Sequence, residues 1–389
     1  MERTKQLVKL LEERGSVDSL AGIVKGIELD WFQTYTLGYS IVTKKSLVSL
    51  DTGLGKTLIA IGLMNYVKAV QPGKKWIYIC ERSNMVSPTG VLKKLEEHSE
   101  LRVISTTAAN KDLVDTFIRQ DVTDYDVIVL SYEAVIDATV NQYLFNYRHL
   151  FNNVIVDESH RIGNGTSLTS RVIKGMCKEA EYVLFTTATP LRIKPNQLVN
   201  QIDMIDRNYL AESPKDYVRQ FEVKNSEGEV VSYKGLSRIG EDVKYRYVGF
   251  TREDLGMRGN YKTKLVLGEP TLKHLQASRK DMHKVIKGDS NSDGFNKLKA
   301  ELERLKSEGK KGLVYCNTND NKRMLLEEFK KEGLTVEVID GSISRKEDRP
   351  LAEERFNRGE IDVVITNITT GLNLQCDFII FWELTLDVK

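Results

Sequence analysis

The sequence predicts an α/β protein in which two parallel-sheet domains follow one another along the chain. Short β-branched runs alternate with longer helical patterns from residue 46 onward, and the alternation resumes after an irregular stretch near 206–265. The runs are apolar throughout, which is typical of strands buried on both faces, in a parallel sheet covered by helices. At 389 residues the chain is long enough for two or three domains.

Composition indicates an ordinary globular protein, with 41% hydrophobic and 29% charged residues. The formal net charge of +2 argues neither for nor against nucleic acid, because a basic groove can exist on a nearly neutral protein. The four cysteines form no CxxC pair, which disfavours a zinc ribbon or a disulfide framework and favours the cytosol. No apolar run approaches the ~20 residues that span a bilayer, so we expect no membrane partner.

In chain order, we expect a helical extension over 1–28, a first domain over 29–205, an irregular bridging segment over 206–270 and a second domain over 271–389. The strands of the first domain are predicted at SLVSL, WIYIC, LRVIST, DVIVLSY, NVIVDE and EYVLFTT. The bridging segment is polar, aromatic and punctuated by glycines. The second domain is predicted to have strands at GLVYC, TVEVID, DVVITN and FIIFWE, with helices near 272–286, 295–308, 319–332 and 346–357.

A glycine-rich loop joins the first predicted strand to a helix, with the sequence Gly53-Leu54-Gly55-Lys56-Thr57. Glycines let backbone N–H groups turn inward around phosphates, and the helix N-terminus adds its positive dipole. We expect Lys56 to contact the β- and γ-phosphates of ATP and the Thr57 hydroxyl to ligate Mg²⁺. Thr52 is assigned to the same loop. The strict phosphate-loop pattern has glycine at position 50, where this chain has Leu50. The alternative to a phosphate loop is a glycine turn that precedes a helix by chance.

A second motif, NVIVDESH, is a predicted strand that ends in Asp157-Glu158. A carboxylate at this end of a parallel strand can hold Mg²⁺ through Thr57 and water, the role expected of Asp157. Glu158 can orient and deprotonate the attacking water as a general base. An isolated Asp-Glu pair is usually a solvated turn, but this one follows a phosphate loop by about 100 residues and precedes a further strand that ends in TATP.

In their order and spacing, GLGKT, DESH and TATP resemble motifs I, II and III of helicase superfamily two. The surrounding segments resemble the Swi/Snf-type DNA translocases of that superfamily. These segments are LDWFQTYTLGY (29–39), LSYEAV (130–135), PNQLVNQIDMID (195–206), KKGLVYCN (310–317), VEVIDGSISRKEDRPLAEERFN (336–357) and ITNITTGLNLQCDFIIFWEL (365–384). The resemblance implies two RecA-like domains in tandem, the core of a P-loop NTPase helicase.

The resemblance also implies roles for single residues. It places Gln33 at the adenine and Gly371 at the nucleotide. It gives coupling roles to His160, Thr187 and Thr189; a relay suits His160 better than a metal-ligand role, since no other histidine is close in sequence.

Contacts with nucleic acid are expected mainly through phosphates. The candidates are Arg82, Ser83, Ser131, Tyr132, Asn317 and Thr366; each alone is more often an ordinary loop residue, and the motif matches favour Ser131 and Thr366. The segment 244–264 interleaves basic and aromatic residues, as nucleic-acid surfaces do, and could also be a solvated hairpin.

Three departures from the family pattern stand out. Glu81-Arg82-Ser83 replaces the usual proline-led start of motif Ia, and motif V, over 366–374, lacks one of its paired glycines. The sequence also ends at Lys389, before motif VI and its arginine finger. Such an arginine increases the rate of well-studied NTPases roughly 10³–10⁵-fold. We therefore expect a missing C-terminal segment or a second chain to supply it.

These observations predict a DNA-dependent ATPase that moves on duplex or branched DNA in replication, recombination or repair. The alternatives are an RNA or strand-separating helicase of the same superfamily, and a nucleic-acid clamp that ATP gates without efficient turnover. The compact form favours a bacterial or phage protein, cytoplasmic in the bacterial or infected cell. A eukaryotic protein of this kind would be nuclear.

Overall fold

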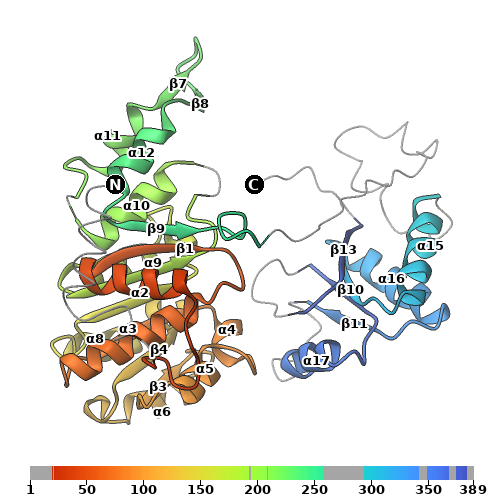
Figure 1. Cartoon of the computed structure of the whole chain (residues 1–389), viewed down its shortest axis with the longest axis horizontal. Coiled ribbons are helices and arrows are strands. Elements are labelled where there is room, and N and C mark those ends of the chain that lie inside the picture. The colour runs from red at the N-terminus through yellow and green to blue at the C-terminus, as the bar shows by residue number, and fades with distance from the viewer. Residues whose placement is uncertain are drawn as a thin grey trace. The chain divides into compact units, whose positions relative to one another are not determined.

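The protein forms two compact units, Met1–Gly259 and Asn260–Lys389, shown in Figure 1. The structure is a computed structural model that describes residues 20, 22–191, 194–207, 209–257, 293–340, 348–367 and 374–382. Most of the extension expected over 1–28, and the helix expected near 272–286, lie outside these ranges. The predicted boundaries at 205 and 270 differ from the division at 259, and they stay predictions.

The first unit is built on a parallel sheet (Figure 1). In spatial order its described strands are β3 (Val103–Thr106), β4 (Val127–Ser131), β2 (Trp76–Cys80), β5 (Asn153–Asp157), β6 (Tyr182–Thr187), β1 (Lys45–Leu50) and β9 (Tyr247–Phe250). Their apolar, β-branched runs are buried on both faces, and β2, β4, β5 and β6 are buried at every position. Because all pairs are parallel, the carboxyl ends of the strands meet at one edge.

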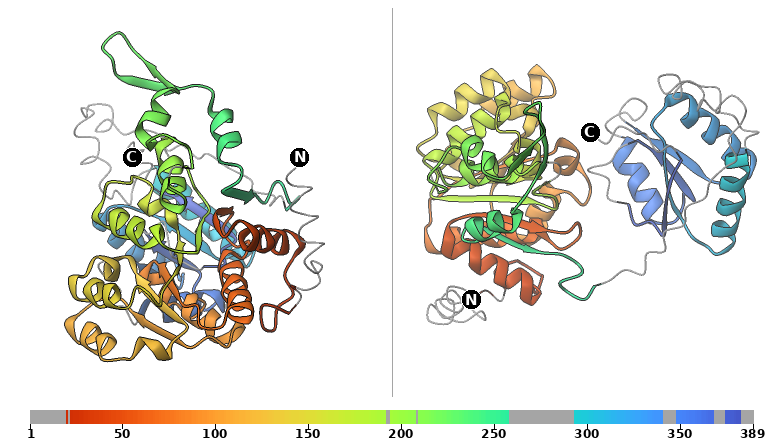
Figure 2. Two further views of the ribbon diagram at one scale, coloured as in Figure 1. Left: turned by 90° about the vertical axis from the view of Figure 1, so that its left-hand side faces the viewer. Right: turned by 90° about the horizontal axis from the view of Figure 1, so that it is seen from above.

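Helices cover both faces of this sheet, as Figure 2 shows from above. One core contains α2 (Trp31–Thr43), α3 (Lys56–Val70), α4 (Arg82–Val86) and α5 (Val91–His98). The other contains α6 (Lys111–Ile118), α7 (Tyr132–Ile136), α8 (Ala138–Asn146), α9 (Leu168–Lys178) and α10 (Asn196–Ile205). Successive residues of β2 point into opposite cores: Ile77 and Ile79 into one, Tyr78 and Cys80 into the other. Among the described helices, none is long and apolar enough to cross a membrane.

The stretch expected to be irregular contains α11 (Pro214–Arg219), a hairpin of β7 (Glu222–Lys224) and β8 (Val230–Tyr233), α12 (Leu236–Val243) and β9. The strand β9 pairs in parallel with β1, from Leu47 opposite Tyr247 to Leu50 opposite Phe250. Its sequence, YVGF, is short and interrupted by Gly249, so its local pattern does not predict a strand. The pairing with β1 places the end of β9 beside the glycine-rich loop.

The second unit has a smaller parallel sheet in the order β11 (Val336–Ile339), β12 (Val363–Thr366), β10 (Gly312–Tyr315) and β13 (Phe378–Phe381). Its described helices are α15 (Asp293–Ser307), α16 (Asn319–Lys331) and α17 (Asp348–Asn357). Buried residues of α15 and α16 belong to one core of this sheet, and those of α17 to the other. The predicted class, α/β with parallel sheets in tandem, is confirmed.

A buried ion pair joins α16 to the end of β11. The Lys322 ammonium lies 2.6 Å from the Asp340 carboxylate, and the two side chains are 2% and 1% exposed. Removing one partner of such a pair leaves an uncompensated buried charge, which costs about 3–5 kcal/mol. This pair therefore fixes the position of α16 on the second sheet.

We predict that Lys322→Met lowers the thermal unfolding midpoint of the second unit, because the buried Asp340 carboxylate loses the ammonium that lies 2.6 Å from it. The matched control is Lys331→Met on the same helix, where the exposed pair with Glu328 is worth about 0–1 kcal/mol. Calorimetry of the full chain measures both. Equal midpoints for the two variants would contradict the role of the buried pair.

Candidate nucleotide-binding and hydrolysis site

The glycine-rich loop begins where β1 ends, and α3 starts within it at Lys56. Gly53 and Gly55 have φ values of 88° and 87°, in the left-handed region that glycine adopts without strain. A Cβ atom at Gly55 would lie only 2.4 Å from the Nε2 atom of Gln33. The backbone conformation therefore favours glycine there, and a Cβ atom would also displace the Gln33 amide.

Gln33 holds α2 against this loop. Its side chain is buried; Nε2 donates to the carbonyl of Leu54 at 3.1 Å, and Oε1 accepts from the backbone N–H of Asp30 at 2.9 Å. An amide can make further hydrogen bonds beyond these two. The structure thus places Gln33 at the loop, while its role as the residue that recognises adenine stays a prediction.

Lys56 and Thr57 lie in the first turn of α3 and are partly buried. The ammonium of Lys56 donates to the carbonyl of Leu50 at 3.0 Å, across the mouth of the loop. Thr52 and Gly53 are exposed and Leu54 is buried. The loop therefore offers backbone N–H groups and one cation at the start of a helix, the arrangement that binds phosphate.

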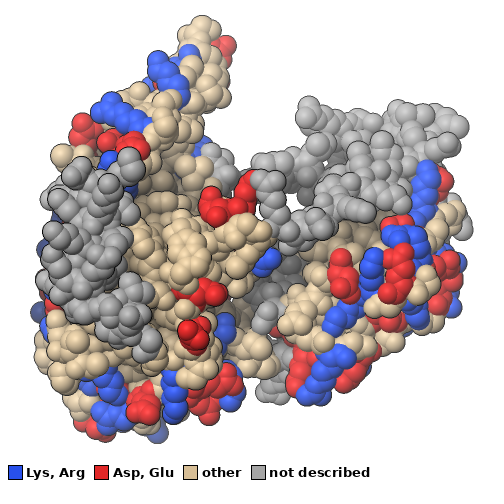
Figure 3. Space-filling view, viewed as in Figure 1, with Lys and Arg blue, Asp and Glu red and all other residues tan. Residues whose placement is uncertain are grey.

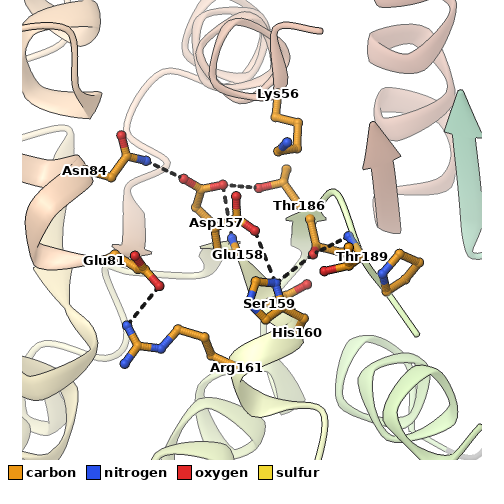
Figure 4. Close-up of polar contacts among 12 residues, drawn as sticks. Lys56, Glu81, Asn84, Asp157, Glu158, Ser159, His160, Arg161, Thr186 and Thr189 are labelled. Carbon is orange, nitrogen blue, oxygen red and sulfur yellow. Dashed lines mark hydrogen bonds and ion pairs between the residues drawn. The ribbon is translucent and has the colours of Figure 1, made fainter. Parts of the chain in front are cut away.

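Asp157 is 3% exposed and ends β5 (Figure 4). Its carboxylate accepts hydrogen bonds from the Thr186 hydroxyl at 2.7 Å, the Asn84 amide at 2.8 Å and the Glu158 backbone N–H at 3.1 Å. Burial raises the pKa of Asp157, and the charge of Glu158 adds to this, whereas the Thr186 hydroxyl and the Lys56 cation lower it. A desolvated carboxylate at a strand end can bind a divalent cation.

Glu158 follows at a backbone φ of 51°, a left-handed conformation that is uncommon for a residue with a side chain. Its carboxylate lies 3.2 Å from the Nδ1 atom of His160, which is also 3.0 Å from the Thr187 hydroxyl. That hydroxyl accepts the backbone N–H of Thr189 at 3.1 Å. The structure brings together the residues predicted to couple DESH to TATP, and their coupling role stays a prediction.

The sequence did not predict two residues that contact Asp157, Asn84 on α4 and Thr186 on β6. Gly90 permits the position of α4, because a Cβ atom there would lie 2.0 Å from the Asn84 carbonyl oxygen. No local pattern around Asn84 indicates a contact with Asp157, which is 73 residues away. Thr186 is adjacent to TATP, and its partner on the neighbouring strand β5 is Asp157 itself.

A second group of contacts links the Asp-Glu turn to β4 and β2. The Tyr132 hydroxyl donates to the Asp157 carbonyl at 2.6 Å and lies 3.2 Å from the Glu158 carbonyl. The Arg161 guanidinium lies 4.7 Å from the centre of the Tyr132 ring and pairs with Glu81 at 3.2 Å. Figure 4 shows Arg161 pointing to Glu81. Arg161 was also not expected from the sequence.

The residues predicted to contact nucleic acid lie in different environments. Arg82 and Ser83 are partly exposed at the start of α4. Ser131 and Tyr132 are buried: the Ser131 hydroxyl caps α7 and donates to the Thr107 carbonyl at 3.0 Å. Both side chains hold strand ends together inside the unit and do not face solvent.

In the second unit, Thr366 is buried at the end of β12, and its carbonyl accepts the Cys316 N–H at 2.9 Å. Asn317 therefore lies beside Thr366 at the carboxyl edge of the second sheet. Gly371 lies outside the described residues.

The donors present fit a magnesium nucleotide. No three His, Cys, Asp or Glu side chains converge within the described ranges. Mg²⁺ bound with a nucleotide usually takes one or two protein ligands together with phosphates and water, where it neutralises phosphate charge. Asp157 and the Thr57 hydroxyl match that requirement, and Lys56 adds a cation for the phosphates.

The glycine-rich loop, the buried Asp157-Glu158 turn and the tandem parallel sheets together form the fold of a P-loop NTPase helicase core. The model of the SNF2-related domain matches residues 40–287, and that of the helicase conserved C-terminal domain matches residues 293–389. The chain therefore belongs to the SNF2-related family. This confirms the Swi/Snf-type resemblance seen in the sequence.

Relatives of known identity match part of the chain. It is 26% identical over 186 residues to the DNA repair and recombination protein RDH54 of Saccharomyces cerevisiae (strain YJM789), covering 42% of this chain and 20% of that protein. It is 30% identical over 167 residues to the DNA annealing helicase and endonuclease ZRANB3 of Bos taurus, and this match covers 41% of this chain and 14% of that protein. The matched part thus spans about a fifth or less of these relatives.

Among solved structures, the chain is similar to the Sulfolobus solfataricus SWI2/SNF2 ATPase core in complex with dsDNA. The TM-score is 0.51 at 15% identity, with 92% of this chain and 82% of the other covered. At this identity the likeness shows the fold alone. It supports the predicted pair of RecA-like domains.

We predict that Asp157→Asn stabilises the protein without nucleotide or Mg²⁺ at neutral pH, yet removes ATP turnover. Because the folded-state pKa of Asp157 is raised, its ionised form is destabilising above that pKa. The gain in the thermal unfolding midpoint should shrink as pH falls through the folded pKa, where Asp157 takes up a proton.

The control is Asp126→Asn. Burial alone would raise the pKa of Asp126, but the Arg102 N–H and the Lys68 ammonium outweigh burial and lower it. Its carboxylate is therefore stabilising above the unfolded pKa, and the control should unfold at a lower temperature at neutral pH. If Asp157→Asn lowered the unfolding midpoint as much as Asp126→Asn does, the destabilising effect of the ionised Asp157 would be contradicted.

Proposed function

We propose that this chain hydrolyses ATP to move along duplex or branched DNA. The observation on which this rests most is the hydrogen bond from Asn84 to Asp157, because it joins a nucleotide-site carboxylate to α4. Arg82 and Ser83 lie on the same five-residue helix and are partly exposed. A phosphate contact at Arg82 or Ser83 would therefore act on a segment bonded directly to the Mg²⁺ ligand.

The contacts of Arg161 support the same coupling from a second direction. Arg161 pairs with Glu81, directly before α4, and covers the ring of Tyr132, whose hydroxyl bonds the backbone of the Asp-Glu turn. A shift of α4 on DNA binding would thus reach Glu158 through side chains already in contact. Among these groups, Glu158 is the proposed general base.

The names of the relatives support DNA as the partner, and the surface charge bears on how DNA would be bound. In the face shown in Figure 3, Lys and Arg side chains are interspersed with Asp and Glu over the described surface. On this face, local contacts, more than a broad basic patch, would therefore bind the DNA backbone. The names of RDH54 and ZRANB3 place those proteins in DNA repair, recombination and annealing.

The first experiment compares steady-state ATP hydrolysis with duplex DNA, single-stranded DNA and RNA side by side. We predict the largest stimulation with duplex or branched DNA. Glu158→Gln should reduce the stimulated rate about 10²–10⁴-fold, since it removes the general base while keeping the side-chain shape. Equal stimulation by RNA would favour an RNA helicase, and a fully active Glu158→Gln variant would contradict the proposed mechanism.

We also predict that Arg82→Ala raises the duplex DNA concentration needed for half-maximal ATPase stimulation. The reason is the loss of one phosphate contact next to Asn84. Arg119→Ala, an exposed arginine at the end of α6, is the control and should leave this concentration unchanged. The same shift in both variants would show that only net charge matters.

Movement on duplex DNA is distinguished from strand separation by two substrates. Displacement of a third strand from a triplex, without unwinding of a forked duplex, is the result expected here. Unwinding of the fork would instead support a strand-separating helicase.

A further inference from the structure

The end of β9 and the phosphate loop lie side by side because β9 and β1 are parallel and paired. Figure 1 shows β9 beside β1, with the turn of residues 251–257 continuing from its end. Two hydrogen bonds, one of them to a side chain, extend the pairing beyond the strands. Asp51 N–H donates to the Phe250 carbonyl at 3.4 Å, and the Asp51 carboxylate accepts the backbone N–H of Arg252 at 2.8 Å.

The side chain of Arg252 lies on the loop itself. Its guanidinium donates to the carbonyl of Thr52 at 3.0 Å. It also lies 2.9 Å from the point where a Cβ atom of Gly53 would be. Arg252 therefore contacts Thr52 and lies over the open side of Gly53, although it is about 200 positions away in sequence.

A tight turn holds Arg252 in this place. The Asp254 carboxylate accepts both the backbone N–H and the hydroxyl of Thr251, at 2.8 Å and 2.7 Å. Met257 N–H donates to the carbonyl of Arg252 at 2.8 Å. The arginine backbone is thus fixed on both sides, so that little ordering is needed before its side chain binds a ligand.

Two cations at the loop contact neutral acceptors. Lys56 donates to the Leu50 carbonyl and Arg252 to the Thr52 carbonyl. Among the described residues, the side-chain hydrogen bonds of these two cations end on backbone carbonyls and not on carboxylates. Backbone carbonyls satisfy the donors without neutralising the charge. The positive charge beside the loop is therefore available to an anion, and a nucleotide polyphosphate carries several negative charges.

We propose that Arg252 binds the polyphosphate of the nucleotide as a second cation beside Lys56. The guanidinium fork suits phosphate oxygens, to which arginine makes short, charge-assisted hydrogen bonds. This assignment deepens the proposed ATP site and rests on it. It also gives the loop a direct contact with residues 251–257, which precede the end of the first unit at Gly259. Nucleotide binding would thereby hold this connecting turn against β1.

The test is equilibrium binding of ATP and ADP to the full chain by calorimetry, in four variants. Arg252→Ala and Arg252→Gln remove the charge, and the glutamine amide can still donate to the Thr52 carbonyl. Arg252→Lys keeps the charge. Lys244→Ala removes one exposed positive charge before the other end of β9 and serves as the matched control.

We expect Arg252→Ala and Arg252→Gln each to weaken ATP binding about 10- to 100-fold, the range of a hydrogen bond to a charged group. Arg252→Lys should restore part of the affinity, and Lys244→Ala should bind like the unaltered protein. The effect should decrease as salt is raised, because the contact is between charges near the surface. Thermal midpoints without nucleotide should stay unchanged.

Unaltered binding by Arg252→Gln would overturn the proposal, since it would show that the arginine only supports the loop backbone. An equal loss in Lys244→Ala would also overturn it, as an effect of net charge. If the unaltered protein does not bind ATP, the proposed nucleotide site itself fails. A failure confined to Arg252 leaves that site standing.

Discussion

The position of the Asp157 carboxylate is the constraint on which the first unit's site depends. It is almost completely buried, and a buried charge is costly unless hydrogen bonds surround it. The donors come from α4, from β6 and from the next residue in the chain. Satisfying this one carboxylate therefore fixes the ends of neighbouring elements relative to β5, and the site is built before any ligand binds.

Strand order determines which groups share the site. Because β6 lies between β1 and β5, its residues Thr186 and Thr187 separate the phosphate loop from the Asp-Glu turn. The cations Lys56 and Arg252 lie at the loop, beside β1 and β9. The carboxylates lie at the end of β5. This division of charge suits a ligand whose phosphates face the loop and whose metal ion faces Asp157.

Local patterns predicted the parts that depend on a few consecutive residues. The strand, loop and helix around GLGKT, and the buried strand before DESH, are visible in sequence because apolar runs and glycines are local signals. Asn84, Arg161 and Arg252 were not assigned to the site, since their contacts depend on how distant strands pair. The interior position of Ser131 and Tyr132 was missed for the same reason: a motif gives a residue's neighbours in sequence and not the direction of its side chain.

The central claim is that Asp157 and the phosphate loop together bind a magnesium nucleotide, and the dependence of ATP affinity on Mg²⁺ tests it most directly. Calorimetric titrations measure the ATP affinity of the full chain and of its Asp157→Ala variant, each with Mg²⁺ and with a chelator. We expect Mg²⁺ to tighten ATP binding to the unaltered protein and to have little effect on binding to the variant. Equal tightening in both proteins would contradict it.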